Sequence, residues 1–146
     1  MARGRSSSVG RYALQATGVV AIAAAAFTGP RLMEGYGALE WTRFHAQRAT
    51  APHGADHARR AAHAAARAVD LTAPLPWASE AARLALGAGE SLGPKNAASA
   101  SAVYGEVRGA LDRVSASSLR GHGLADVTNR ARALDDAARP PAGTAP

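Results

Sequence analysis

The sequence predicts an all-α protein, with one N-terminal transmembrane helix followed by a small bundle or short α-solenoid of about five antiparallel helices. Three observations lead to this prediction. Residues 12–30 carry no charged side chain, and Arg11 and Arg31 flank them. Beyond this segment, apolar residues recur at steps of three and four, which is the period of a helix. No stretch alternates apolar and polar residues as a half-buried strand does.

The uncharged segment 12–30 has the length that a membrane-spanning helix requires. A hydrocarbon core of about 30 Å needs roughly 20 residues of helix. Alanine dominates the segment, and Leu14 and Phe27 are its strongest apolar anchors. We therefore predict a transmembrane helix that acts as a retained signal anchor and contacts membrane lipid.

Basic residues on one side of the segment predict its orientation. The tail over residues 1–11 holds three Arg, and the first acidic residue of the chain is Glu34. Cytoplasmic flanks of membrane helices are enriched in Lys and Arg. The prediction is a single-pass protein of a bacterial inner membrane, with a basic cytoplasmic tail and a periplasmic helical domain over residues 31–138.

Three other interpretations of the N-terminus stay open. A cleaved signal peptide has the same basic and apolar regions, and Ala24, Ala25 and Ala26 match a small-residue cleavage site. An Arg- and Ser-rich start without acidic residues also suits an organelle transit peptide. A buried helix of a soluble protein is the third alternative.

Composition limits the size and the chemistry of the protein. A chain of 146 residues suits one small domain. It has no Cys, which excludes disulfides, a thiol nucleophile and a Cys-ligated metal. The formal charge is +6, but three of the 17 basic residues lie in the N-terminal tail, which leaves 14 against 11 acidic residues. Such interspersed charge lacks the concentrated basic face of nucleic-acid-binding proteins, so we expect no nucleic-acid partner.

The first helix after the segment is expected directly behind Pro30 and runs to about Arg48. Pro30 should end or kink the preceding helix. The large apolar residues of the first helix form one side, which is expected to be core or to lie partly at the membrane interface. These residues are Leu32, Met33, Tyr36, Leu39, Trp41 and Phe44. Pro52 and Gly54 mark the following loop, residues 49–55.

The second helix is predicted over residues 56–71. Its small apolar residues recur at helical spacing and predict a buried stripe of Ala58, Ala61, Ala62, Ala65 and Val69. Arg60, His63 and Arg67 lie on the opposite face. Asp56 falls in the first turn, where a negative charge suits the helix dipole.

The third helix is expected over residues 77–92, after a Pro-rich break. Its predicted inward residues are Trp77, Ala81, Leu84, Ala85, Ala88 and Leu92. Glu80 and Arg83 have the spacing of an exposed ion pair. Gly87 and Gly89 each weaken the helix by about 1 kcal/mol relative to Ala, which indicates a closely packed neighbour.

The fourth helix is predicted over residues 96–115, with Asn96 as its N-cap after the stop at Gly93. Its inward stripe is Ala100, Val103, Tyr104, Val107, Leu111 and Val114. Gly105 and Gly109 predict a flat groove for close packing of another helix.

The fifth helix is predicted over residues 124–138, after a flexible connection around His122. Its inward residues are Leu124, Val127, Ala131, Leu134 and Ala138. Residues 139–146 are expected to form a disordered tail. The connections are short, so neighbouring helices should be antiparallel.

The ends of the second and third helices resemble tetratricopeptide repeats. The third helix runs through LALGAGESLGPKNAA, and Leu92, Pro94, Asn96 and Ala97 match the turn of such a repeat best. First-to-third and second-to-fourth helix starts are both about 40 residues apart, which is in the range of helical-hairpin repeats. The resemblance covers about residues 55–111, in the turns only. It implies an α-solenoid fragment whose concave face binds a partner segment, as in small single-span bacterial envelope proteins; a generic antiparallel bundle is the alternative.

Candidate chemistry in the sequence is sparse. His53 and His57 are four residues apart and could grip a metal ion from one helical turn, but no third ligand can be assigned. No Ser lies in a recognisable catalytic motif, and Asp135 and Asp136 should point to different sides of their helix. We therefore predict no enzyme activity, no catalytic, cofactor-binding or metal-binding residues, and no cofactor.

The remaining function hypotheses concern partners. The first is a membrane-anchored, non-enzymatic helical interaction module or accessory subunit of a bacterial envelope complex, with a larger membrane or envelope protein as its partner. The alternative is a secreted or periplasmic binding protein for a metal or small ligand, released by signal cleavage. A small structural subunit that folds poorly alone is a variant of the first.

Overall fold

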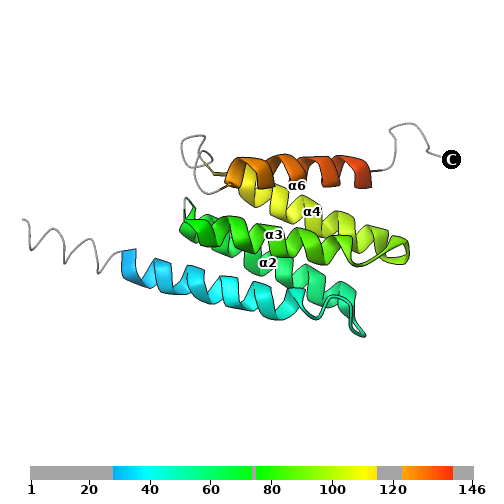
Figure 1. Cartoon of the computed structure of the whole chain (residues 1–146), viewed down its shortest axis with the longest axis horizontal. Helices are drawn as coiled ribbons and strands as arrows, with labels where there is room; N and C mark the ends of the chain where they lie inside the picture. Colours follow the sequence, from blue (N-terminus) through cyan, green and yellow to red (C-terminus); the bar gives the residue numbers. More distant parts are fainter. Residues whose placement is uncertain (1–27, 74, 115–122, 140–146) are drawn as a thin grey trace, which may run out of the picture.

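The structure is a computed structural model that describes residues 28–73, 75–114 and 123–139. Every regular element in these residues is helical, so the all-α prediction is confirmed. Residues 28–46 form a helix that we call the leading helix. It is followed by α2 (Gly54–Thr72), α3 (Pro76–Glu90), a 3₁₀ turn (Pro94–Asn96), α4 (Ala97–Asp112) and α6 (Leu124–Ala138). Consecutive helices run antiparallel, as the short connections predicted (Figure 1).

Several predictions fall on residues that the structure does not describe. These are the basic tail (1–11), the transmembrane segment up to residue 27, the connection around His122, and residues 140–146 of the C-terminal tail. Within the described ranges, no helix combines the length and the apolar character that crossing a bilayer requires. Residues 28–30 belong to the same helix as the residues that follow, so this helix does not end at Pro30, and the alternative prediction of a kink there stays a prediction.

Helices two apart in the chain lie side by side at a regular offset. Side chains meet partners about 40 residues further along: Arg43 with Glu80, Arg59 with Ser99, His63 with Glu106, Asp70 with Arg113, and Glu90 with Arg130. The leading helix is thereby joined to α3, α2 to α4, and α3 to α6. This stacking agrees with the 40-residue spacing of helix starts in the sequence.

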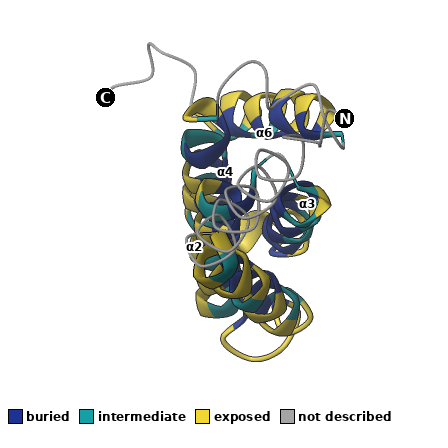
Figure 2. Ribbon diagram, turned by 90° about the vertical axis from the view of Figure 1, so that its left-hand side faces the viewer, coloured by how far each residue is buried: buried dark blue, intermediate teal, exposed yellow. Residues whose placement is uncertain are grey.

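Small residues build the core, as the stripes predicted. In α2 all five predicted residues are buried, and in α4 only Val114 of the predicted six is not fully buried. Figure 2 shows the buried residues on the sides of α2, α3 and α4 that face one another. Alanine stripes let helix axes approach closely, so dispersion contacts stabilise a core that has few large side chains.

The space around each predicted packing glycine shows whether a neighbouring helix lies close to it. A Cβ on Gly89 would lie 2.6 Å from the Tyr104 ring, so the predicted close neighbour exists there. Gly87 has nothing within 4 Å of such a Cβ, and the same prediction is wrong for it. Gly105 and Gly109 also meet only ordinary contacts, at 3.6 and 3.9 Å, so close packing through this pair is wrong.

On the leading helix, the first of the two predictions, that the large apolar residues are core, is wrong except for Leu39, and the alternative of a membrane interface stays a prediction. Leu39 is 1% exposed, but the other large apolar residues face outward. Leu32 is 37% exposed, Met33 74%, Tyr36 43%, Trp41 60% and Phe44 43%. The buried side consists of Gly35, Ala38, Leu39, Thr42 and His45. Gly35 has no room for a Cβ because the Thr72 methyl group lies against it, so close approach favours small residues on this side.

The predicted pair of Glu80 and Arg83 does not form because Glu80 has another partner. Glu80 accepts hydrogen bonds from Arg43 of the leading helix, at 2.6 and 3.1 Å. The predicted N-cap position of Asn96 is confirmed, but its side chain donates to the Leu92 carbonyl at 3.3 Å instead of capping α4.

Candidate functional site

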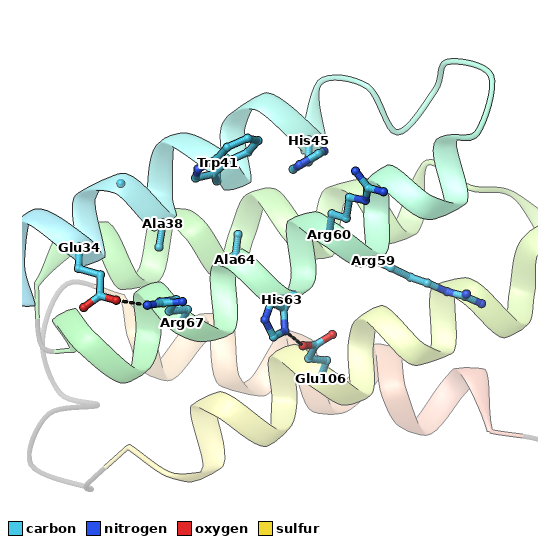
Figure 3. Close-up of a pocket in the computed structure, with 11 residues that line it drawn as sticks. Glu34, Ala38, Trp41, His45, Arg59, Arg60, His63, Ala64, Arg67 and Glu106 are labelled. Atoms are coloured by element: carbon cyan, nitrogen blue, oxygen red, sulfur yellow. Dashed lines mark hydrogen bonds and ion pairs between the residues drawn. The ribbon is translucent and has the colours of Figure 1, made fainter.

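A groove of about 770 Å³ lies along the leading helix and α2, with α4 at its edge. Its lining is Glu34, Gly37, Ala38, Trp41 and His45 from the leading helix, Arg59, Arg60, His63, Ala64 and Arg67 from α2, and Glu106 from α4. Figure 3 shows Ala38 and Ala64 at its middle, with the charged side chains around them. Apolar and charged groups thus line one open surface, which is typical of a binding site.

The groove follows from the register of an antiparallel helix pair. The chain reverses through residues 47–53, where His53 adopts φ 67° and Gly54 packs against the Ala49 carbonyl. Residues whose numbers add to 101 or 102 then face one another across the pair. Glu34 pairs with Arg67, and His45 with His57. These two pairs join the helices about 11 residues apart, which is roughly 16 Å along a helix.

The histidine pair closes one end of the groove. His45 Nδ1 lies 2.9 Å from His57 Nδ1, so one ring donates and the other accepts. His45 is 6% exposed and stacks on Trp41, with ring centroids 5.4 Å apart and planes at 17°. Burial lowers the pKa of His45, and the positive charges of His57, Arg60 and Arg48 lower it further. The pair is therefore held in a form in which His45 is neutral.

The cations of the groove are not equally neutralised. Arg67 pairs with Glu34, and His63 lies 3.0 Å from Glu106. Arg59 donates to the Ser99 hydroxyl at 3.1 Å, which leaves its charge uncompensated. Arg60 has no hydrogen-bond acceptor or carboxylate partner among the residues that the structure describes. Figure 3 shows Arg60 extending from α2 toward the end of the leading helix that carries His45.

A second hollow of about 580 Å³ continues the groove between α2 and α4. It shares His63, Arg67 and Glu106 with the first and extends to Gly105 and Gly109. The ion pair of Arg113 with Asp70, at 2.8 Å, borders it. The outer surface of α2 is therefore hollowed along most of its length.

An exposed aromatic edge flanks the groove. Trp41 and Phe44 meet edge to face, with centroids 5.7 Å apart. The Arg48 guanidinium lies 3.7 Å from the Phe44 ring centroid, a cation–π contact. Exposed aromatic and Arg side chains of this kind are enriched in the anchors of protein interfaces.

The two histidines of the predicted candidate metal pair lie at the start of α2, where the His57 N–H donates to the His53 carbonyl at 3.2 Å. His53 lies exposed in the turn before α2, whereas His57 lies in the first turn of α2 and pairs with His45. No group of three or more His, Asp or Glu side chains in the described ranges is arranged to hold a metal ion. Asp135 is 4% exposed in its side chain and Asp136 65%, so they do point to different sides.

Sequence reasoning missed Trp41, His45 and Arg60 as members of one site. The register across the loop at residues 49–55 is a partial signal. Antiparallel helices place positions equally far from the loop opposite one another, which pairs residue 45 with 59, two residues beyond its observed partner His57. Hydrophobic periodicity alone gives no such pairing.

The chain matches no protein-family model, no curated protein sequence and no solved structure. The candidate site therefore rests on its own geometry.

Proposed function

We propose that this protein is a non-enzymatic interaction module that docks a helical segment of a larger protein in the groove between the leading helix and α2. The observation that carries this proposal is the open groove with an apolar middle, a Trp wall and an aromatic edge on one surface. Helix-in-groove recognition uses such a surface, with the apolar face of the partner helix seated between two host helices.

Gly37 supports the proposal because no contact within the described residues requires a glycine there. A Cβ at this position would meet no atom within 4 Å, and glycine in a helix interior costs about 1 kcal/mol relative to alanine. Its absent side chain leaves room in the groove. A partner backbone that approaches closely would account for that room.

We further propose that residues 12–30 anchor the module in a bacterial inner membrane as a signal anchor, with the helical domain in the periplasm. The uncharged segment and the basic residues before it support this placement. The partner is then a larger membrane or envelope protein, and the resemblance of the turns to tetratricopeptide repeats points to the same kind of role.

Two matched variants test the proposed function. Gly37→Leu fills the groove, whereas Gly87→Leu places the same side chain at an equally open position on α3. Tagged full-length chains are purified from native membranes in mild detergent, and the intact mass reports whether the N-terminus is retained. We expect one larger protein to co-purify with the wild type and with Gly87→Leu, and to be lost with Gly37→Leu.

Two results would contradict the proposal. If Gly37→Leu retains the same protein as the wild type, the groove is not the docking site. If the chain is clipped near Phe27 and purifies alone, the anchored module is wrong, and the alternative of a released protein that binds a metal or small ligand takes its place.

A further inference from the structure

The groove has a defined length and two unlike sides. Glu34 with Arg67 closes one end, and His45 with His57 closes the other. The roughly 16 Å between them matches about three turns of helix. The side formed by the leading helix is apolar through Gly37, Ala38 and Trp41, whereas the side formed by α2 carries cationic groups.

The positive charge is concentrated at the end near the histidine pair. At the other end Arg67 is neutralised by Glu34, and in the middle Glu106 lies against His63. Arg59 and Arg60 have no carboxylate partner among the described residues, and both are exposed.

An occupant that complements this surface must be apolar on one face and acidic on the other. Carboxylates can accept bidentate hydrogen bonds from Arg guanidinium groups, and such charge-assisted contacts are about twice as strong as neutral ones. A basic occupant would instead place like charges against Arg59 and Arg60, which is a common means of rejecting wrong partners.

We infer that the groove recognises an acidic amphipathic helix of about three turns, which seats its apolar face against Trp41 and Gly37 and its carboxylates on Arg59 and Arg60. This inference rests on the proposed function and names the chemistry of the partner. All four residues line the groove. Figure 3 shows Arg60 pointing toward the end of the leading helix that carries His45, and Arg59 extending toward α4, where it meets Ser99.

Two synthetic peptides of roughly 14 residues test the inference with full-length protein in detergent. Both are amphipathic helices with Leu on one face; the first carries Glu on the other face and the second carries Lys. Binding is measured by the anisotropy of a labelled peptide. Trp fluorescence gives a second measurement. The chain has two Trp, so in the Trp77→Phe variant all Trp emission comes from Trp41 in the groove.

The Glu peptide is expected to bind and to shift the Trp41 emission, and the Lys peptide is expected to bind at least about tenfold more weakly. Arg60→Glu should weaken the Glu peptide about tenfold or more, and Arg59→Glu should act in the same direction. Lys95→Glu makes the same charge change at an exposed position outside the groove and should leave binding unchanged.

Equal binding of the two peptides, or no effect of Arg60→Glu, would overturn the inference. Vesicles of phosphatidylglycerol provide a second test, because a lipid headgroup is also anionic. If these vesicles shift the Trp41 emission through Arg60 and the Glu peptide does not, the anionic partner is a lipid and the inference is wrong. The peptide results test only the chemistry of the partner. The proposed docking function fails by a different result, namely that the Gly37→Leu variant still co-purifies with the native partner.

Discussion

The imidazole rings of His45 and His57 lie Nδ1 to Nδ1 at 2.9 Å, and they join the leading helix to α2 next to the turn between these helices. Trp41 stacks on one face of His45 and Phe44 meets it edge on, with ring centroids 5.4 and 5.1 Å apart. Protonation of His45 would place a buried positive charge near Arg60 and Arg48. The pair therefore favours a neutral His45.

Acidification should destabilise the folded chain through His45. Its pKa is lowered by burial, then by His57, Arg60 and Arg48, from an ordinary value of about 6.5. A lowered histidine pKa means that the unfolded chain binds more protons, so stability is complete above about pH 6.5 and falls as the pH drops below that value. We expect His45→Gln to flatten this dependence, measured as the free energy of unfolding between pH 7 and 5.

The control for this prediction is His53→Gln, which removes an exposed histidine from the turn. It should leave the slope of stability against pH as steep as in the wild type. An equally steep slope in His45→Gln would show that the histidine pair does not carry the effect.

Two glycines of α3 should respond to alanine in opposite directions. Gly89→Ala places a Cβ 2.6 Å from Tyr104 Cε1 and 3.1 Å from Val103 Cγ1, and both residues are buried. The overpacking should cost about 1 to 3 kcal/mol. Gly87→Ala meets nothing within 4 Å and should gain up to about 1 kcal/mol from helix propensity. Chemical denaturation measures both, and equal effects would refute the packing of α3 against α4.

The same comparison applies to the leading helix. Gly35→Ala drives a methyl group into Thr72 of α2, whereas Gly37→Ala has free space. We expect Gly35→Ala to destabilise by about 1 to 3 kcal/mol and Gly37→Ala to stabilise by up to about 1 kcal/mol. Thermal unfolding followed by circular dichroism distinguishes them. A neutral Gly35→Ala would mean that the leading helix does not pack on α2 as closely as described.

Asp135 should matter far more than its neighbour. Its side chain, 4% exposed, accepts from Arg108 of α4 at 2.8 Å and from Arg139 at 2.7 Å. Asp135→Ala removes a buried carboxylate that accepts two charge-assisted hydrogen bonds and should cost roughly 2 to 3 kcal/mol. Asp136→Ala removes an exposed carboxylate and should cost less than about 1 kcal/mol. Similar losses in urea denaturation would contradict the role of Asp135 in joining α6 to α4.

Most of the helices could be predicted because apolar residues at helical spacing indicate both a helix and the face that it buries. The stripe of α2 is buried as predicted, and α6 has the predicted bounds, Leu124–Ala138. Gly93, with φ 67°, ends the third helical region where the sequence placed its stop. In these elements the apolar face and the packing face are the same.

On the leading helix, the largest apolar side chains are not the buried ones. Hydrophobicity makes Trp41 and Phe44 candidates for the core, but close packing against α2 favours Gly35, Ala38 and Thr42. The Thr42 hydroxyl donates a hydrogen bond to the Ala38 carbonyl at 2.8 Å, so this polar residue can be buried without an unpaired polar group. The large residues are left outside, and the groove beside them could not be predicted from periodicity.

The most direct measurement places a photo-crosslinking amino acid in the groove of the full-length chain. Ala64 lies half-buried on its floor, and the exposed Ala125 of α6 provides the matched position outside it. After irradiation of native membranes, we expect position 64 to trap one larger protein through an acidic helical segment, and position 125 to trap none. Absence of a crosslink at position 64, or the same crosslink from both positions, would contradict docking in this groove.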